Sequence, residues 1–333
     1  MTETLASVLA GHPLAEPIWV LAKTSMKVAG LIARSPITGG AEIAESAANA
    51  SGDAPKALDL RAQDLYVAAL RGSGISGLAS EEAEEVIDLG AGDYVMAMDP
   101  IDGSSNIDIN APIGTIFSIL PRGELTNEQA LLQSGRHVVA AGFVLFGPST
   151  VLVLSIGEGT DIYAFADGDY VRIHRAIEIP EDAHEYAVNA SNARHWGPGV
   201  TAYVADLVAG EIGPRGRDFN MRWLASLVAE TYRILLRGGI YLYPADSRPA
   251  YAQGRLRLVY EAIPMSFLVE QAGGIGTDGG MRILDRQPVD LHEKTPFIFG
   301  SKSKVERVCR YLDDPPVQHE ASPLFKNRGL LRS

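Results

Sequence analysis

Residues 94–106 read YVMAMDPIDGSSN, and this stretch decides both the fold class and the chemistry to expect. Its first five residues are apolar at every position, which is typical of a strand covered on both faces. Asp99 and Asp102 follow directly, and open α/β sheets usually bind their ligands where such strands end. The stretch therefore predicts a buried strand that carries two carboxylates into a binding site.

The Asp-Pro-Ile-Asp-Gly-Ser part of this stretch combines cation ligands with anion donors. Pro100 restricts the backbone, and the spacing of Asp99 and Asp102 can turn both carboxylates to one side. Gly103 and the two serines after it form a turn whose N–H groups can converge on an anion. Carboxylates combined with phosphate oxygens are the ligands that Mg²⁺ prefers. These residues fit a magnesium and phosphate site, and equally an ordinary polar turn.

Helices and strands alternate on both sides of this stretch. Amphipathic spacing predicts helices, and apolar runs bounded by turn residues predict strands. The helices are expected at 16–34, 60–71, 221–237 and 265–272, and the strands at 94–98, 115–120, 138–146, 151–156, 240–243 and 256–260. This alternation predicts a mixed α/β fold. The polar, turn-rich residues 179–182 predict a boundary between two domains, 1–180 and 181–333.

Several carboxylates outside the central stretch have ordinary structural interpretations as well as functional ones. Glu81 and Glu82 open an acidic run that fits the first turn of a helix. Asp59 fits the N-cap of the predicted helix at 60–71. Glu261 follows the predicted strand at 256–260, again at a strand end. Taken one by one, these residues do not decide between structural support and a ligand cluster.

Small residues dominate positions 37–54, of which two thirds are Gly, Ala, Ser or Thr. Such a stretch buries little apolar area, so we expect it to be mobile. It fits a disordered connector, and it also fits a lid over an active site.

Composition excludes several function classes. Among 333 residues, 29 Lys and Arg oppose 41 Asp and Glu, giving a formal charge of −12, which argues against a nucleic-acid partner. This acidity fits a protein that collects divalent cations, and equally simple solubility. The single Cys309 excludes an intramolecular disulfide and a multi-thiolate metal site. The first residues lack a signal-peptide pattern, and the apolar stretch 137–157 is broken by a turn, so we expect a cytoplasmic protein without a membrane partner.

The longer context of these motifs resembles class I fructose-1,6-bisphosphatase. The short Asp-Pro-Ile-Asp-Gly-Ser core is shared with inositol monophosphatases, whereas the longer runs favour the bisphosphatase branch. These runs are SEE (80–82), DPIDGSSNID (99–108), IGTIF (113–117), GGIYLYP (238–244), GRLRLVYEA (254–262), PM (264–265), EQAGG (270–274) and PVDLH (288–292). The resemblance covers roughly residues 16–312 and implies a layered α-β-α-β-α sandwich.

The resemblance implies hydrolysis of the 1-phosphate of fructose 1,6-bisphosphate with Mg²⁺ or Mn²⁺, two or more ions per subunit. The residues that match the family's metal ligands are the carboxylates of Glu81, Asp99, Asp102 and Glu261 and the carbonyl of Ile101. Asp59 and Glu82 match the pair that holds and deprotonates the attacking water. Asp53 matches an aspartate of the family's dynamic loop, which implies a catalytic role and a lid near residues 37–58.

The same carry-over assigns the substrate contacts. Asp102, Gly103, Ser104 and Ser105 would hold the 1-phosphate side, and Asn189, Arg222 and Tyr243, with Tyr241 nearby, the 6-phosphate side. Arg222 of the family reaches a neighbouring subunit, which implies a homotetramer. Three departures from the family pattern alter the contacts to the 6-phosphate. Arg255 stands where lysine is common, and Trp223 and Asn192 stand where tyrosines are common.

These departures leave alternatives open. Sedoheptulose 1,7-bisphosphate is a second possible substrate, alone or together with the fructose bisphosphate, and inositol and nucleotide phosphates are more distant ones. A silent sugar-phosphate sensor would require a lost carboxylate, and none is missing. The pathway is open between gluconeogenesis and a carbon-fixation cycle. Asp93 stands where AMP-inhibited members carry lysine, so we expect weak or absent AMP inhibition, and a lone Cys309 excludes the cysteine-loop control of chloroplast members.

Overall fold

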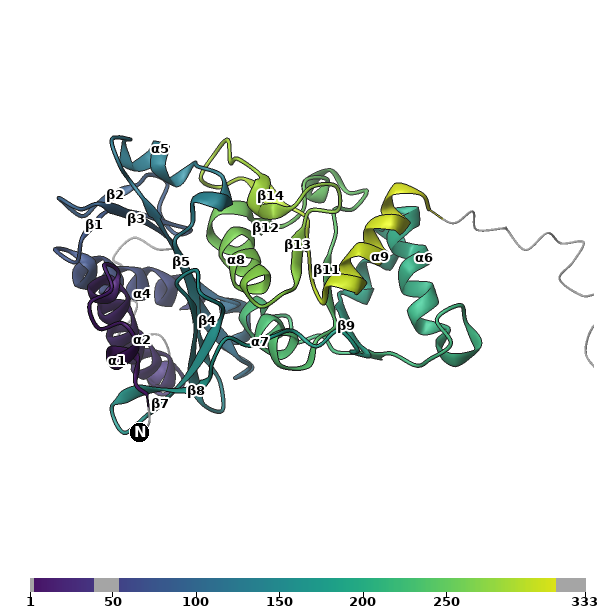
Figure 1. Ribbon diagram of the computed structural model, residues 1–333, viewed down its shortest axis with the longest axis horizontal. Helices are drawn as coiled ribbons and strands as arrows, with labels where there is room; N and C mark the ends of the chain where they lie inside the picture. Colours follow the sequence, from purple (N-terminus) through teal and green to yellow (C-terminus); the bar gives the residue numbers. More distant parts are fainter. Residues whose placement is uncertain (1–2, 39–53, 316–333) are drawn as a thin grey trace, which may run out of the picture.

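The computed structural model describes residues 3–38 and 54–315, which form alternating layers of helix and sheet (Figure 1). The helices of the first layer are α1 (Leu5–Val8), α2 (Ala15–Thr38) and α4 (Ala54–Leu70), those of the middle layer α7 (Leu227–Arg237) and α8 (Ile263–Gln271), and those of the last layer α6 (Pro198–Val208) and α9 (Lys302–Asp313). A large sheet separates the first two layers, and a smaller sheet separates the last two. The predicted α-β-α-β-α sandwich is therefore confirmed.

The large sheet has the strand order β2-β1-β3-β4-β5-β6-β7-β8 within the described residues, and only β1 and β3 pair in parallel there. Its strands are β1 (Ile75–Ser80), β2 (Ile87–Asp88), β3 (Tyr94–Asp102), β4 (Ile113–Pro121), β5 (Ala140–Phe146), β6 (Thr150–Ser155), β7 (Asp161–Ala166) and β8 (Asp169–His174).

The smaller sheet has the order β10-β9-β11-β15-β13. Its strands are β9 (Glu185–Val188), β10 (Asn220–Met221), β11 (Ile240–Tyr243), β13 (Ile275–Thr277) and β15 (Phe297–Gly300), and a separate pair joins β12 (Leu256–Arg257) to β14 (Lys294–Thr295).

Strand β3 is buried on both faces because its side chains alternate between two hydrophobic cores. Val95 and Ala97 face the middle helices, whereas Met96 and Met98 face α2 and α4. This alternation is why the run is apolar at every position and why it predicts a covered strand. The strand therefore delivers its polar carboxyl end to the interior of the molecule.

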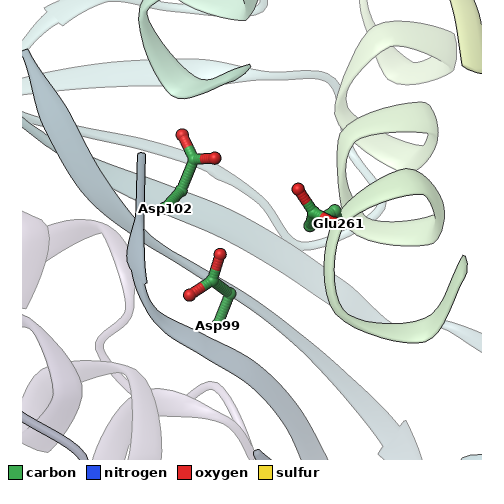
Figure 2. Close-up of side chains that lie close together, drawn as sticks. All are labelled: Asp99, Asp102 and Glu261. Atoms are coloured by element: carbon green, nitrogen blue, oxygen red, sulfur yellow. The ribbon is translucent and has the colours of Figure 1, made fainter. Parts of the chain in front are cut away.

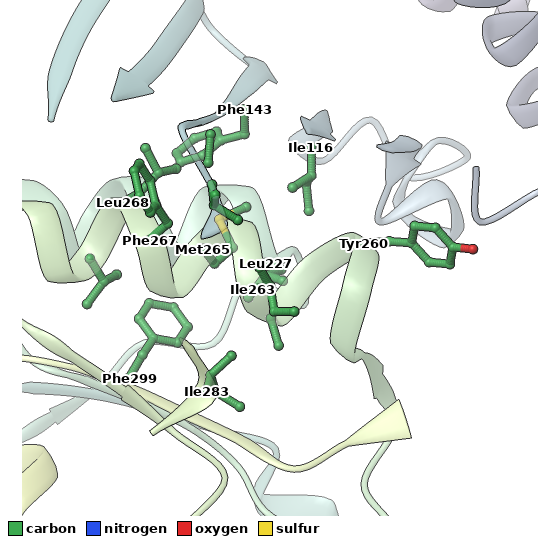
Figure 3. Close-up of a cluster of buried hydrophobic side chains, with 14 of the residues drawn as sticks. Ile116, Phe143, Leu227, Tyr260, Ile263, Met265, Phe267, Leu268, Ile283 and Phe299 are labelled. Carbon is green, nitrogen blue, oxygen red and sulfur yellow. The ribbon is translucent and has the colours of Figure 1, made fainter. Parts of the chain in front are cut away.

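The middle helices lie between the two sheets and supply the central core. Figure 3 shows Met265, Phe267 and Leu268 of α8 among side chains of both sheets, including Phe143 and Phe299. Burying each large apolar side chain of this kind contributes roughly 1.5–3 kcal/mol. This dense packing holds α7 and α8 firmly against the strand ends that carry polar residues.

Most predicted elements are confirmed, with shifted ends. The helices at 16–34 and 265–272, the strand at 240–243 and the hairpin of β5 and β6 occur where the sequence predicts them. Among the described residues, no helix is long and apolar enough to cross a membrane. Asp93 is exposed just before β3.

Three local interpretations were wrong. Helix α4 begins at Ala54, so Asp59 lies inside the helix and not at its N-cap. Glu81 and Glu82 lie in a turn after β1 and not at a helix N-terminus, since the Glu81 N–H donates to the Met98 carbonyl of the neighbouring strand. The predicted strand 256–260 ends at Arg257, and Glu261 lies in a π-helix, Leu258–Ala262.

The predicted helix at 221–237 starts later than expected. Helix α7 begins at Leu227, because Ser226 is its N-cap and accepts a hydrogen bond from the Ala229 N–H. Ala225, just before the cap, has a φ of 53° in the left-handed region, which ends any helix entering from residue 222. Residues 222–226 therefore form a connecting loop after β10.

Candidate functional site

Three buried carboxylates converge between the large sheet and the π-helix (Figure 2). Asp99, Asp102 and Glu261 each offer one oxygen, and these oxygens all lie within 4.8 Å of one another. The first two come from the end of β3 and the third from the turn that leads into α8. Each side chain is buried. Residues 159 positions apart in the chain thus form one acidic cluster.

A bulge at the end of β3 turns both aspartates to one side. Asp99 pairs with Ile116 and Asp102 with Gly114, so β3 uses one residue more than β4 over this interval. The Ile101 N–H donates to Asp99 Oδ1 at 3.0 Å, and Thr115 Oγ1 donates to the Pro100 carbonyl at 2.8 Å. A bulge of this kind re-aims side chains beside a site.

The N-terminus of α7 holds Asp102. The Val228 N–H donates to Asp102 Oδ2 at 3.0 Å, and hydrogen bonds from the Leu227 N–H and the Ser226 side chain also favour the ionised carboxylate. Gly103 follows with a φ of 77°, which suits glycine, and opens the short 3₁₀ helix Ser104–Asn106. Helix α7 therefore ties the Gly103 turn to the acidic cluster.

Arg257 connects Glu81 to the cluster. Its backbone N–H donates to Glu261 Oε2 at 2.6 Å, and its Nε lies 3.3 Å from Glu81 Oε1. Its Nη1 also donates to the His292 carbonyl at 2.9 Å. Glu81 lies close to Asp99, because after burial its charge has the largest effect in raising the pKa of Asp99.

The cluster is crowded with like charge. Burial, and then the neighbouring carboxylates, raise the pKa of Asp99 and of Glu261 well above the usual range. Burial also raises the pKa of Asp102 to about 6, although α7 donates hydrogen bonds to its ionised form. No Lys or Arg in the described part of the chain forms an ion pair with any of these three. Buried carboxylates with hard oxygen donors and no paired cation fit a divalent ion such as Mg²⁺ or Mn²⁺.

Removal of metal should therefore make stability fall with rising pH. Because the folded pKa of Asp102 exceeds its unfolded value, the folded state binds more protons between about pH 4 and 6, and stability falls over that window. With chelator, we expect the melting temperature of the wild type to drop by about 5 °C more than that of Asp102→Asn between pH 4.5 and 7.5.

Saturating Mg²⁺ should remove this extra loss in the wild type. The exposed Asp108→Asn should behave as the wild type does, because that side chain lies outside the cluster. Parallel melting curves of wild type and Asp102→Asn in chelator would contradict the prediction.

A second carboxylate pair lies beside the cluster. Asp59 on α4 is buried, and its Oδ1 has no hydrogen-bond partner in the part of the chain that the structure describes. Burial, and then the charge of Glu82, raise the pKa of Asp59 to about 7, while a hydrogen bond with Ser104 opposes the rise. A carboxylate with this pKa is suited to accept a proton near neutral pH.

An aromatic wall extends from the acidic cluster. The rings of Trp223 and Tyr241 are stacked with centroids 5.8 Å apart, and Tyr243 lies 5.8 Å from Trp223 and 6.1 Å from Tyr241. Burial, then Tyr243, and then the charges of Glu261 and Asp102 raise the pKa of Tyr241, so this wall lies next to the cluster. Arg255 lies over Tyr243, with Cζ 5.8 Å from the ring centre.

Two of the other predicted substrate residues directly follow strands of the smaller sheet, and Ser105 follows a strand of the large sheet. Asn189 directly follows β9 and accepts a hydrogen bond from the Ser191 N–H at 3.2 Å. Arg222 follows β10, is 56% exposed, and has its Nε 3.5 Å from Glu185 Oε1. Ser105 is exposed at the turn after β3. Asp53 and most of the predicted lid at 37–58 lie outside the described residues.

Sequence reasoning missed several residues that shape this site. Arg257 carries no mark in the sequence that would separate it from other arginines, although it lies four residues before Glu261. Thr115 supports the β3 bulge, and its Oγ1 lies 3.0 Å from the Tyr66 hydroxyl on α4. Arg248 and Tyr251 lie beside Arg255. Their contacts depend on strand pairing and loop path, which no local pattern predicts.

Comparisons with known proteins give one consistent result. Family models described as the N-terminal and C-terminal domains of fructose-1-6-bisphosphatase match residues 22–175 and 179–313. The chain is 48% identical to a class 1 fructose-1,6-bisphosphatase of Rhizobium meliloti (strain 1021), over 94% of this chain and 91% of that protein. It is 51% identical to one of Cereibacter sphaeroides (strain ATCC 17025 / ATH 2.4.3), over 86% of each.

A solved structure agrees with these relatives. The fold is similar to the crystal structure of Leishmania major fructose-1,6-bisphosphatase in holo form, with a TM-score of 0.85 and 30% identity, over 94% of this chain and all of the other. The predicted family, fold class and enzyme class are thereby confirmed. The chain belongs to the class 1 fructose-1,6-bisphosphatase family.

Proposed function

We propose that this chain hydrolyses the 1-phosphate of fructose 1,6-bisphosphate, giving fructose 6-phosphate and phosphate, in the presence of Mg²⁺ or Mn²⁺. The observation that carries the proposal is the cluster of Asp99, Asp102 and Glu261, whose oxygens lie within 4.8 Å without a paired cation among the described residues. Family membership supports the assignment of this substrate, because the relatives are named for fructose 1,6-bisphosphate.

The acidic cluster would hold the cations. Asp99, Asp102, Glu261 and Glu81 would supply carboxylate oxygens and Ile101 its carbonyl oxygen, with two or more ions per subunit. When bound, such ions neutralise charge on phosphoryl oxygens and acidify a coordinated water. The helix α7 N-terminus would keep Asp102 ionised and oriented, because its N–H groups already donate to that carboxylate.

Asp59 and Glu82 would hold the attacking water and accept its proton. The unpartnered Asp59 Oδ1 is the atom that would take this proton, and the nearby charge of Glu82 keeps the pKa of Asp59 high enough to do so. The Gly103 turn, with Ser104 and Ser105, would donate hydrogen bonds to the 1-phosphate oxygens. Asp53 would join from the predicted lid.

The sugar and the 6-phosphate would lie along the aromatic wall and the smaller sheet. Asn189, Tyr243 and Arg255 would contact the 6-phosphate side, and Tyr241 would lie nearby. We also propose a homotetramer in which Arg222 reaches the site of a neighbouring subunit, since its side chain is 56% exposed directly after the edge strand β10. We further propose two domains that meet near residue 180, which the spans of the two family models support. We also propose a cytoplasmic location, which the single cysteine supports.

Phosphate release with Mg²⁺ from three substrates tests the proposed function. We expect rapid release from fructose 1,6-bisphosphate and slow release from inositol 1-phosphate. Comparable turnover of sedoheptulose 1,7-bisphosphate would indicate the dual-specificity alternative. It would also favour a role in a carbon-fixation cycle over a role in gluconeogenesis alone. Absence of release from all three, together with retained sugar-phosphate binding, would support the sensor alternative and overturn the proposal.

A further inference from the structure

The Tyr251 ring contacts two guanidinium groups at the far end of the aromatic wall. Cζ of Arg255 lies 4.2 Å from the ring centre, and Cζ of Arg248 lies 4.4 Å from the same centre. Both distances are well within the range of a cation–π interaction, and a planar guanidinium stacks on an aromatic ring better than an ammonium does. Tyr251 therefore holds two cations at defined positions.

The loop around Tyr251 is fixed by its own backbone. The Tyr251 carbonyl accepts hydrogen bonds from the Asp246 N–H at 3.2 Å and the Gly254 N–H at 3.0 Å, and the Tyr251 N–H donates to the Arg248 carbonyl at 2.9 Å. Pro249 opens the short 3₁₀ helix Pro249–Tyr251 and restricts the backbone further. The backbone that carries the ring is thus held in place, and the ring forms a platform between the two guanidinium groups.

Arg248 is already neutralised within this loop. Its guanidinium forms an ion pair with the nearly buried Asp246, and its Nη2 donates to Asn192 Oδ1 at 2.9 Å. Hydrogen bonding from Arg248 lowers the pKa of Asp246 to about 2, so the carboxylate stays charged near neutral pH. Asn192, one of the departures from the family pattern, therefore accepts a hydrogen bond that holds Arg248 in place. Arg248 clamps the platform.

Arg255 has no such partner. In residues 3–38 and 54–315 it forms no ion pair with a carboxylate; it contacts the rings of Tyr251 and Tyr243 and donates a hydrogen bond to the Tyr243 side chain. Gly254 directs it, because a Cβ at that position would lie 2.1 Å from the Thr295 carbonyl carbon, so only glycine lets the chain pass there. The charge of Arg255 is oriented and left available.

A row of aromatic rings joins the Arg255 guanidinium to the acidic cluster. Arg255 contacts Tyr243, Tyr243 adjoins Tyr241, and Tyr241 lies near enough to Asp102 and Glu261 for their charges to raise its pKa. A ligand lying along this wall has one end at the acidic cluster and the other at Arg255. An oriented, unpaired guanidinium at that second end suits a second phosphoryl group.

We propose that Tyr251, clamped by Arg248, is a positioning residue that fixes Arg255 and thereby selects substrates that carry a second phosphoryl group. This inference rests on the proposed function. It also gives a physical reason for arginine at 255 where the family commonly has lysine, since the guanidinium gains a stacking surface that an ammonium would use less well.

Steady-state kinetics on two substrates test the inference. For fructose 1,6-bisphosphate, Tyr251→Ala should raise KM about fivefold with kcat within about twofold, and Tyr251→Phe should restore the wild-type KM. For fructose 1-phosphate, which lacks the far phosphate, Tyr251→Ala should leave KM unchanged. Arg255→Ala should raise the bisphosphate KM about 30-fold, and adding Tyr251→Ala to it should have no further effect.

The outcomes separate this inference from the proposed function. Equal KM values for wild type and Tyr251→Ala on an active enzyme would overturn the inference and leave the function intact. A KM rise of the same size for fructose 1-phosphate, or additive effects in the double variant, would mean a merely structural role and also overturn it. A wild type that releases no phosphate from the bisphosphate would overturn both. Melting temperatures within a few degrees of wild type, with the rescue by Tyr251→Phe, exclude misfolding as the cause.

Discussion

Replacing Asp99 by asparagine is expected to lower kcat at least about 1000-fold and at the same time to stabilise the metal-free protein. Loss of a carboxylate from the cation site removes several kcal/mol of transition-state stabilisation, and about 4 kcal/mol corresponds to that factor. The amide can still accept the hydrogen bond from the Ile101 N–H, so the β3 bulge should survive. The effect on activity is therefore not a consequence of misfolding.

The stabilising effect has a separate cause. Asp99 is buried beside Glu81, Asp102 and Glu261, and without metal these like charges repel one another. A neutral side chain relieves that repulsion, so in chelator at pH 7.5 the melting temperature of Asp99→Asn should exceed that of the wild type. In saturating Mg²⁺ the order should reverse, because the wild type gains stability from the bound ion.

Phosphate-release assays and melting curves with and without Mg²⁺ measure both effects. Asp108→Asn is the matched control, since Asp108 belongs to the same run of sequence but is exposed. Its kcat and both melting temperatures should equal those of the wild type. Retention of more than about a tenth of the wild-type kcat by Asp99→Asn, with a normal Mg²⁺ dependence, would refute the role of the cluster.

Replacing Asp59 by asparagine should lower kcat about 1000-fold without removing the cation site. General-base catalysis typically contributes a factor of about 10²–10⁴, and an amide cannot accept the proton that Asp59 Oδ1 would take. Because Asp59 is not one of the three clustered residues, the Mg²⁺-dependent rise in melting temperature should persist. This retained metal response distinguishes Asp59→Asn from Asp99→Asn.

The pH dependence gives an independent check. Without metal the pKa of Asp59 is about 7, and a nearby cation lowers the pKa of a carboxylate. Wild-type kcat should thus fall as the pH drops below a midpoint at or under about 7, whereas the residual activity of Asp59→Asn should lack this limb. Asp64→Asn, exposed on the same helix, should keep the wild-type profile. An unchanged acid limb in Asp59→Asn would show that another group accepts the proton.

Glu82→Gln should lower kcat in the same phosphate-release assay, because the two carboxylates would hold the attacking water together. Its acid limb should persist and move to lower pH, since the charge of Glu82 raises the pKa of Asp59 after burial. Residues that act as a unit give non-additive losses, so the double variant should be little worse than either single variant.

Local patterns predicted the elements whose side chains meet apolar neighbours. The strand at 94–98 was predictable since Val95 and Met96 face two different cores, which requires an unbroken apolar run. The same patterns were wrong for Asp59, which resembles a cap but lies inside α4, and for Glu261, which lies within a π-helix and not after a strand. In both cases the residue type is one that local structure also favours at such a position, so the local pattern was misleading.

The α/β class, the family and the carboxylates at 99 and 102 were predictable from the residues alone, because a motif of fixed spacing at the end of an apolar strand is a local property. The resemblance to the family already assigns Glu261 to the same metal site. The folded arrangement is what brings the three carboxylates within 4.8 Å of one another, lets α7 donate hydrogen bonds to Asp102, and places Tyr251 against both Arg248 and Arg255. The physical reason is that these contacts join segments whose separation is set by the packing of two sheets around α7 and α8, and contact energies between distant segments leave no periodic trace in the chain.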